Sequence, residues 1–353
     1  MKIATIIGAR PQFIKSAPIS KKIESHEFLS EIIIHTGQHF DKNMSKIFFN
    51  ELGLPNPNFN LNVNKMVYGK MVKRMFDKIC KILFLESVDG VLVYGDTNST
   101  LAGCLSAKKF GLPVFHVESG LRSFDRSMLE ESNRLITDHL SSVLFCPSQS
   151  SVDNLSNEDI SGEIVLSGDV MYDAFLHFDS KFNDKNIHLN DSKYVLATIH
   201  RRENIYSKKR LGEIIKNLNR IHSDCGVVMP MHPHTRKIVA ENNLSVKIKL
   251  IDPQGYLSMM SLLKNCEMVI TDSGGLQKES FFAKKKCLIV RDQTEWVELI
   301  DEGFSTLCKP EELSQKFNEN INVDLKFSKN IYGNGNSSGL IIDSITNFFK
   351  CNN

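Results

Sequence analysis

The chain has 353 residues, of which 41% are hydrophobic and 24% charged, with a formal net charge of +2 and a pI near 8.0. This length favours two domains, and the composition is that of a globular protein. The near balance of charge gives no nucleic-acid signature, and no apolar run approaches the roughly 18 residues that span a bilayer. The eight cysteines lack C-x-x-C pairs and metal-ligand spacing. We therefore expect reduced thiols in a cytoplasmic protein with no membrane or nucleic-acid partner.

The first predicted element is a buried strand at Lys2–Ile7, which leads into the loop 8–11. Pro11 suits the start of a helix, so Arg10 and Lys15 would lie at the mouth of a strand–helix turn, where parallel sheets bind ligands. Because the spacing is not GxGxxG, we predict a phosphate or sugar-nucleotide site and not a dinucleotide site. The alternative is that Arg10 and Lys15 are solvated surface charges.

Apolar β-rich runs alternate with helical patterns along the chain, which predicts an α/β protein with parallel sheets covered on both faces. The polar segment Phe178–Ser192 divides the strands into two sets. We therefore expect two Rossmann-like domains that face a cleft, at residues 1–177 and 178–335. The first set of predicted strands continues with Glu31–His35, Val91–Tyr94, Pro113–Val117, Val143–Cys146 and Ile164–Leu166. The second set is Tyr194–Ile199, Gly226–Met231, Lys247–Ile251, Met268–Thr271 and Cys287–Val290, and the predicted helices include Met71–Leu85, Ser99–Lys109 and Lys208–His222.

Acidic residues follow neighbouring elements of the first half. Asp96 and Glu118 each follow a predicted strand, and Glu130 with Glu131 opens a helix. Such positions gather at one edge of a parallel sheet, and crowded carboxylates make a general acid and a general base available near neutral pH. We therefore predict proton transfer at an unactivated carbon. The alternatives are a helix N-cap for Asp96, a plain loop acid for Glu118, and positions favoured by the helix dipole for the other two.

The second half contains the most informative segment, Val269–Glu279 (VITDSGGLQKE). It predicts a strand that delivers Ser273, Gly274 and Gly275 to the start of a helix. Adjacent glycines let backbone N–H groups approach a ligand without a Cβ, and a helix N-terminus favours anions. Glu279, one turn further on, would reach sugar hydroxyls beside a bound phosphate. The alternative is an ordinary strand–turn–helix junction.

Two histidines follow predicted strands of the second half. His200 stands beside Arg201 and Arg202, a grouping that suits pyrophosphate binding or proton shuttling. His232 ends another strand, where a histidine often serves as a structural hydrogen-bond partner. Because histidines and acids fall on separate elements without a spacing rule, we predict no metal site.

Taken together, these motifs resemble the non-hydrolysing UDP-N-acetylglucosamine 2-epimerases. The matching segments occur in the family's order over roughly residues 3–300, with a weaker NIYGNGNSSG match near the end. They are GARPQFIKSAP, HTGQHF, VYGDTNSTLAG, HVESGLRSFDRSMLEESNR, TIHRREN, MHPHTR, IDPQGYL, TDSGGLQKES and RDQTEWVEL. The resemblance implies a GT-B fold, a C-terminal helix at 336–353 that returns to the first domain, and UDP held by the second domain.

The resemblance also implies a reaction. A base removes the C2 proton while UDP leaves by anti elimination, and re-addition of both gives inverted C2. Neither NAD nor a metal is needed, because elimination acidifies the C2 proton. The implied acid–base set is Asp96, Glu118 and Glu130, with His200 assisting near the phosphates. The implied UDP-sugar contacts are Arg10, Lys15, Gln254, Ser273, Gly274, Gly275, Glu279 and Trp296, with Glu131, Arg201 and His232 as further candidates. The implied partners are a UDP-sugar for surface polysaccharide synthesis and a second copy in a homodimer.

Three positions depart from the family pattern. Leu129 replaces the usual proline before the paired acids, which puts the position of Glu130 in question. Trp296 replaces an arginine of the family pattern. This replacement and the segments GARPQFIK and TGQHFDKNM resemble the branch that acts on UDP-2,3-diacetamido-2,3-dideoxy-glucuronic acid. The alternative is that Trp296 packs in a domain interface. The segment 40–43 differs from members with an allosteric UDP-N-acetylglucosamine site, so allosteric activation is in doubt.

Other reaction classes remain open from the sequence. A hydrolysing 2-epimerase would release free N-acetylmannosamine and UDP. A retaining GT-B glycosyltransferase would share the fold and the UDP site but would need an acceptor and no acid trio. A catalytically inactive UDP-sugar-binding regulator would show no exchange at C2.

Overall fold

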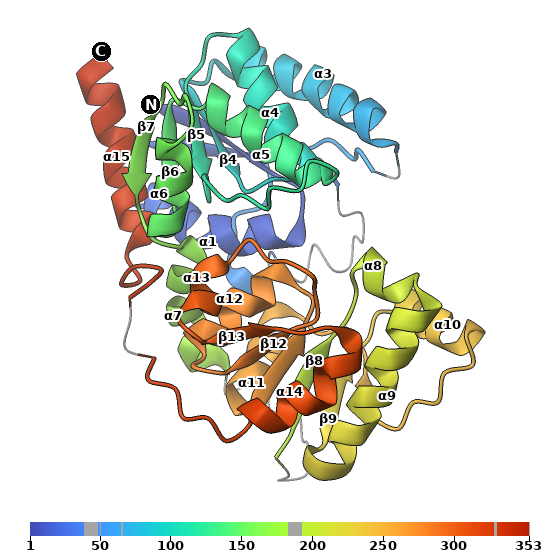
Figure 1. Ribbon diagram of the computed structural model, residues 1–353. Coiled ribbons are helices and arrows are strands. Elements are labelled where there is room, and N and C mark those ends of the chain that lie inside the picture. Colours follow the sequence, from blue (N-terminus) through green and yellow to red (C-terminus); the bar gives the residue numbers. More distant parts are fainter. Residues whose placement is uncertain (39–48, 50, 65, 183–192, 328–329, 353) are drawn as a thin grey trace. The chain divides into compact units, whose positions relative to one another are not determined.

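The computed structural model describes residues 1–38, 49, 51–64, 66–182, 193–327 and 330–352. It comprises two compact units (Figure 1), one formed by Met1–His177 with Asn330–Asn353 and the other by Phe178–Lys329. The segment 40–43, which bears on allosteric activation, lies outside the described residues, as do residues 183–192 of the predicted linker.

The first unit is built on a seven-stranded parallel sheet in the order β3-β2-β1-β4-β5-β6-β7. The chain reverses its direction across the sheet between β1 and β4, and ligands of such sheets bind beyond the carboxyl ends of the strands at that switch point. The strands are β1 Lys2–Ile7, β2 Ser30–His35, β3 Phe59–Asn60, β4 Gly90–Tyr94, β5 Val114–Val117, β6 Val143–Cys146 and β7 Glu163–Leu166.

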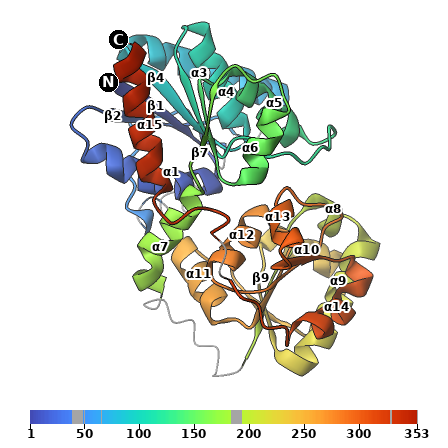
Figure 2. The same cartoon turned by 60° about the vertical axis from the view of Figure 1, so that its left-hand side comes forward.

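Helices cover both faces of this sheet. On one face α3 (Tyr68–Glu86), α4 (Asn98–Lys109) and α5 (Leu129–Leu140) pack side by side, whereas α1 (Arg10–Glu24) packs against α15 (Ser337–Asn352) on the other (Figures 1 and 2). Right-handed crossovers in opposite directions from the switch point require this division. The remaining helices of the unit are α6 Gln149–Ser156 and α7 Val170–Phe182, whose last turn is assigned to the second unit.

The C-terminal helix α15 is anchored in the first unit at both ends. At its start, the Asp173 carboxylate of α7 accepts hydrogen bonds from the backbone N–H groups of Ser337 (3.0 Å) and Ser338 (2.7 Å). These are N–H groups that the first turn of a helix leaves without internal partners. Near its end, Phe348 and Phe349 pack edge-on against Phe115 of β5.

The second unit repeats the arrangement with six parallel strands in the order β10-β9-β8-β11-β12-β13. Its switch point lies between β8 and β11. The strands are β8 Val195–Thr198, β9 Val227–Pro230, β10 Lys249–Ile251, β11 Met268–Thr271, β12 Cys287–Ile289 and β13 Ser305–Leu307. The helices are α8 Arg202–Ile205, α9 Lys208–Cys225, α10 Pro233–Glu241, α11 Tyr256–Asn265, α12 Gly274–Phe282, α13 Val297–Asp301, η1 Pro310–Glu312 and α14 Leu313–Asn320.

The predicted strands and helices are confirmed to within a few residues at each end, and the structure adds two short edge strands, β3 and β13. The boundary between the two units falls at the start of the predicted linker Phe178–Ser192, and α7 continues through its first five residues to Phe182. Phe178 and Phe182, one helical turn apart, both pack edge-on against Tyr256 of α11. Their shared packing stabilises the last turn of α7 within the segment that we predicted as a linker.

Candidate functional site

Glu118 pairs with a lysine at the carboxyl edge of the first sheet. Its carboxylate contacts the Lys15 ammonium of α1, and both side chains are about one-twelfth exposed (8% each). Lys15 is therefore no solvated surface charge, and its nearest anion is the predicted catalytic acid. Glu118 also has a φ of 65°. A non-glycine residue in this left-handed region stores strain that the surroundings must hold, as is frequent at active sites.

Asp96 is held from helix α5. Its carboxylate lies 2.6 Å from the Arg134 guanidinium, and its carbonyl accepts a hydrogen bond from Asn133 Nδ2 at 2.8 Å. The alternative that Asp96 caps a helix is wrong, because Thr97 is the N-cap of α4 and its hydroxyl accepts from the Thr100 N–H. Asp96 is therefore a partly exposed carboxylate with its own cation.

The paired acids of α5 have different surroundings. Glu131 is buried and accepts hydrogen bonds from the backbone N–H groups of Ser123 and Phe124 (3.0 Å each) and from Arg134. Burial alone raises the pKa of Glu131, but the Ser123 and Arg134 interactions outweigh it and lower the pKa. Glu131 thus holds the loop after β5. Glu130 is exposed at the first turn of the helix.

We expected the neighbouring carboxylates to set one another's protonation. Instead, Glu118 and Asp96 are each in contact with a cation. Among the residues that the structure describes, Glu130 has no ion pair. Its charge acts instead on Tyr68, whose pKa is raised by burial and, to a smaller extent, by Glu130. Leu129 still begins α5, so the missing proline leaves the helix start in place.

The loop after β1 is fixed by a glutamine. The backbone N–H groups of Gly8 (2.8 Å) and Ala9 (3.0 Å) donate to Gln12 Oε1, and Gln12 Nε2 donates to the Tyr94 carbonyl at the end of β4. Pro11 lies within the first two positions of α1, as predicted. The N–H groups of Gly8 and Ala9 are already bonded, so any phosphate contact here falls to Arg10.

Asp272 organises the switch point of the second unit, and our sequence reasoning missed it. This buried carboxylate after β11 accepts hydrogen bonds from the backbone N–H groups of His200 and Arg201 and from Asn204 Nδ2, all at 3.0–3.1 Å. His200 Nδ1 lies 3.4 Å from the same carboxylate, while 56% of the His200 side chain is exposed. An acid between a strand end and a glycine turn was the signal available in the sequence.

The glycine turn after β11 begins α12 as predicted, with Ser273 as its N-cap. A Cβ on Gly274 would lie 2.7 Å from Glu295 Oε1, so only glycine lets this carboxylate lie against the helix start. Glu295 pairs with Arg291 at 2.8 Å and lies 4.0 Å from the Arg201 guanidinium. Glutamate and two arginines thus meet at the N-terminus of α12, a group that the sequence did not indicate. Gly275 and Glu279 lie on the same helix.

Trp296 is buried, with 3% of its surface exposed, and the Lys278 ammonium lies 4.1 Å from the centre of its ring. Its backbone N–H donates to the Thr294 hydroxyl, which donates to Gln277 of α12. We expected the indole to offer a flat apolar face to a sugar. The cation covers one face of the ring, which leaves at most the other face and the edge for that role.

Two further predicted residues lie in loops of the second unit. His232 is the N-cap of α10, and its Nδ1 accepts from the His234 N–H at 3.2 Å, which is a structural role. Gln254 lies between β10 and α11, where its Nε2 donates to the Asp252 carbonyl. Within the described ranges no His, Cys, Asp and Glu side chains gather in a metal-binding group, and no helix is long and apolar enough to cross a membrane.

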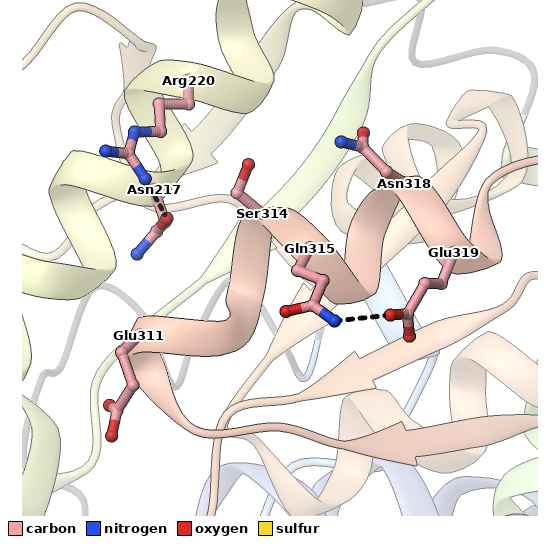
Figure 3. A pocket seen from close by; sticks show the side chains of 7 residues that line it. All are labelled: Asn217, Arg220, Glu311, Ser314, Gln315, Asn318 and Glu319. Carbon is pink, nitrogen blue, oxygen red and sulfur yellow. Dashed lines mark hydrogen bonds between the residues drawn. The ribbon is translucent and has the colours of Figure 1, made fainter.

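A polar groove of about 640 Å³ lies on the surface of the second unit, lined from α9, η1 and α14 (Figure 3). Its side chains bond to each other: Arg220 donates to Asn217, and Gln315 donates to Glu319. None of the predicted site residues lines it. The groove follows helix surfaces and is separate from the strand ends where the predicted residues gather.

Comparison with known proteins agrees with this geometry. A protein with 44% identity over 97% of this chain and 99% of its own length is the UDP-2,3-diacetamido-2,3-dideoxy-D-glucuronate 2-epimerase of Pseudomonas aeruginosa. A UDP-N-acetylglucosamine 2-epimerase homolog of Methanococcus maripaludis is 46% identical over 98% of this chain and all of its own length.

Solved structures of related proteins have the same fold as this chain. The Methanocaldococcus jannaschii UDP-GlcNAc 2-epimerase, in complex with UDP-GlcNAc and UDP, matches with a TM-score of 0.88 at 40% identity, covering 98% of this chain and 99% of that one. Acinetobacter baumannii MurG, at 13% identity and a TM-score of 0.57, shares the fold alone. The two parallel-sheet units thus form a GT-B-like fold. The family model described as UDP-N-acetylglucosamine 2-epimerase matches residues 21–346, and the chain therefore belongs to the UDP-N-acetylglucosamine 2-epimerase family.

Proposed function

We propose that this protein inverts C2 of a UDP-N-acetylhexosamine by elimination and re-addition of UDP, without hydrolysis. The observation that carries the proposal is the set of acids at the carboxyl edge of the first sheet, where Glu118 and Asp96 each have a dedicated cation and Glu130 has none among the described residues. Inversion of a carbon needs proton removal on one face and proton return on the other, so at least two groups of different protonation state are required.

The proposed chemistry balances without an added reactant. A carboxylate takes the C2 proton, the C1–O bond to UDP breaks, and a C1=C2 double bond forms, which leaves a 2-acetamidoglucal and the UDP anion. Lys15 and Arg134 hold the carboxylates of Glu118 and Asp96 in fixed orientations, so we assign proton removal to these two acids. Glu130 then returns a proton to the opposite face of C2 while UDP adds back at C1.

The nucleotide would bind at the switch point of the second unit. The start of α12 presents Ser273, Gly274 and Gly275, whose N–H groups and helix dipole suit a diphosphate. Glu279 would take the ribose hydroxyls, with Gln254 as a further contact. His200, oriented by Asp272, would donate to the leaving phosphate. Arg201 would be released from Glu295 to pair with the diphosphate.

The test is incubation of a UDP-N-acetylhexosamine in D2O followed by NMR. The proposal predicts a mixture of C2 epimers that carry deuterium at C2 and remain attached to UDP. Stoichiometric free N-acetylmannosamine would identify a hydrolysing enzyme. Transfer to an added acceptor without exchange at C2 would identify a glycosyltransferase, and binding without exchange would identify a regulator.

For the sugar, we propose a 3-acetamido uronic acid of the UDP-2,3-diacetamido-glucuronate type. The replacement of the family's arginine by Trp296 supports this, since an indole cannot pair with phosphate but offers an apolar surface and one N–H donor. The 3-acetamido substrate should have a higher kcat/KM than UDP-N-acetylglucosamine. Trp296→Arg should reduce the difference in kcat/KM between the two substrates. Equal or better activity of the wild-type protein on UDP-N-acetylglucosamine would contradict this proposal and would make UDP-N-acetylglucosamine the substrate.

We further propose a homodimer in the cytoplasm, supplying precursors of a surface polysaccharide. Large apolar side chains are exposed on α3 and α5, among them Phe84 (73%), Leu85 (76%) and Ile136 (41%), and a second copy would cover them. All eight cysteines are free thiols, which suits a reducing compartment. Light scattering of the wild-type protein and of Leu85→Glu tests the dimer, and fractionation of cells tests the location.

A further inference from the structure

A buried histidine connects the segments that carry the three acids. His116 lies on β5 with no exposed surface, two residues before Glu118. Its Nδ1 lies 2.7 Å from Asp138 Oδ1 on α5, and its Nε2 lies 2.8 Å from the Gly95 carbonyl oxygen at the end of β4. Both ring nitrogens therefore face oxygen atoms.

Neither oxygen can donate a proton to the ring. The Gly95 carbonyl is only an acceptor. The Asp138 carboxylate accepts from Arg122 Nη1 at 2.7 Å and from the Gly120 N–H at 3.2 Å through its other oxygen. Burial alone raises the pKa of Asp138, but the His116 and Arg122 interactions outweigh it and hold the pKa below its usual value. Asp138 is thus ionised, and the His116 ring links this carboxylate of α5 to the Gly95 carbonyl.

Arg122 extends this network, because it also donates to both oxygens of Glu158, at 2.7 and 2.8 Å. Cys104 of α4 and Cys146 of β6 complete the surroundings, and burial raises the pKa of both thiols to about 12, so they stay neutral.

We propose that His116, which bridges α5 and the end of β4, is a positioning residue for the acid trio. Through Gly95 it holds the residue before Asp96, and through Asp138 it holds both α5, which carries Glu130, and Gly120, which ends the strained turn at Glu118. A Cβ on Gly95 would meet Glu118 Oε2 at 3.1 Å and Lys15 Nζ at 3.3 Å, so a shift of this backbone would disturb that ion pair. His116 touches no substrate in this assignment, which rests on the proposed function.

The hydrogen bonds of the ring can be measured without activity. The full chain is labelled with ¹⁵N-histidine, and His116 is assigned by the signals that His116→Gln removes. We expect a ring N–H of His116 that exchanges slowly with solvent, because the ring is fully buried and hydrogen-bonded. A rapidly exchanging ring N–H would overturn the proposal, whether or not the protein is an epimerase.

The positioning role has a kinetic test. Glutamine cannot bridge the Asp138 carboxylate and the Gly95 carbonyl as the imidazole ring does, so His116→Gln should lower kcat by about 10²-fold, the scale expected when catalytic groups are misplaced by an ångström. KM and the Kd for UDP should stay within about twofold of wild type. The matched control is His139→Gln, an exposed histidine on α5 whose ring bonds only to its own helix, which should change nothing. A folded His116→Gln with wild-type kcat would refute the role.

Discussion

At the scale of single residues, the three acids of the site differ in whether a cation contacts them. Glu118 is strained in its backbone and paired with Lys15, and Asp96 is paired with Arg134. Strain and buried charge both reduce stability, and a fold retains them where chemistry needs an acid in one fixed orientation. Glu130 is exposed and has no such partner among the described residues, and it is the acid to which we assign the return of the proton.

Substitution of the three acids tests this assignment. Asp96→Asn, Glu118→Gln and Glu130→Gln should each lower turnover by about 10²-fold or more, because each removes a proton-transfer group. The Kd for UDP should change little, since the nucleotide residues belong to the second unit. Glu163→Gln, an exposed acid at the start of β7, is the control. A fully active Glu130→Gln would remove Glu130 from the mechanism.

Substitution of Lys15 distinguishes its two possible roles, which are support of Glu118 and binding of phosphate. If it serves Glu118, Lys15→Met should lower kcat by about 10²-fold while the Kd for UDP remains unchanged. A phosphate-binding lysine would show the reverse, a weaker Kd with little change in kcat at saturation. Lys22→Met, on the exposed last turn of the same helix, should leave both constants unchanged.

Glu131 should affect stability and its pH dependence more than proton transfer. Its pKa is lowered in the folded state, so its contribution is present above the unfolded value of about 4.3 and disappears as the pH falls through the folded value. We expect Glu131→Gln to lower the free energy of unfolding by about 2 kcal/mol at pH 7. In urea titrations the difference from wild type should shrink below about pH 4. A difference that grows at acid pH would contradict this sign.

At the scale of elements, the sequence predicted where side chains would lie but not what they would touch. Apolar runs set the strands, and parallel order brings their carboxyl ends to one edge, so Asp96, Glu118 and the turn at Ser273 could be placed. The contacts of Lys15 with Glu118 and of Arg134 with Asp96 join elements 103 and 38 residues apart in the chain. No local pattern records such pairings, and the same holds for Asp272 and the backbone of His200.

Helix α12 gives a test at this scale. Gly274→Ala would bring a Cβ to 2.7 Å from Glu295 Oε1 and force that carboxylate away from Arg291. We expect the Kd for UDP to rise at least about tenfold, the effect of losing one good charged contact. The matched change Gly212→Ala, in the open middle of α9 with its nearest neighbour at 3.8 Å, should instead add up to about 1 kcal/mol of stability. An unchanged Kd in Gly274→Ala would exclude the helix start from nucleotide binding.

At the scale of the whole molecule, two sheets with the same strand order carry different chemistry. Each has a switch point with side chains gathered beyond it, yet one gathers paired acids and the other a glycine turn, a histidine and arginines. The fold alone does not distinguish an epimerase from a glycosyltransferase, since both classes share it. The distinction lies in the acids of the first unit.

The central claim is that the bond between C1 and the UDP oxygen breaks in every turnover. A UDP-N-acetylhexosamine labelled with ¹⁸O in the bridging C1–O–P position tests it by ³¹P NMR. If UDP is released and added back, the label should spread from the bridge to the non-bridging oxygens of the β-phosphate, alongside deuterium exchange at C2. Epimerisation with deuterium at C2 but with the label retained in the bridge would contradict elimination and with it the proposed roles of the acids.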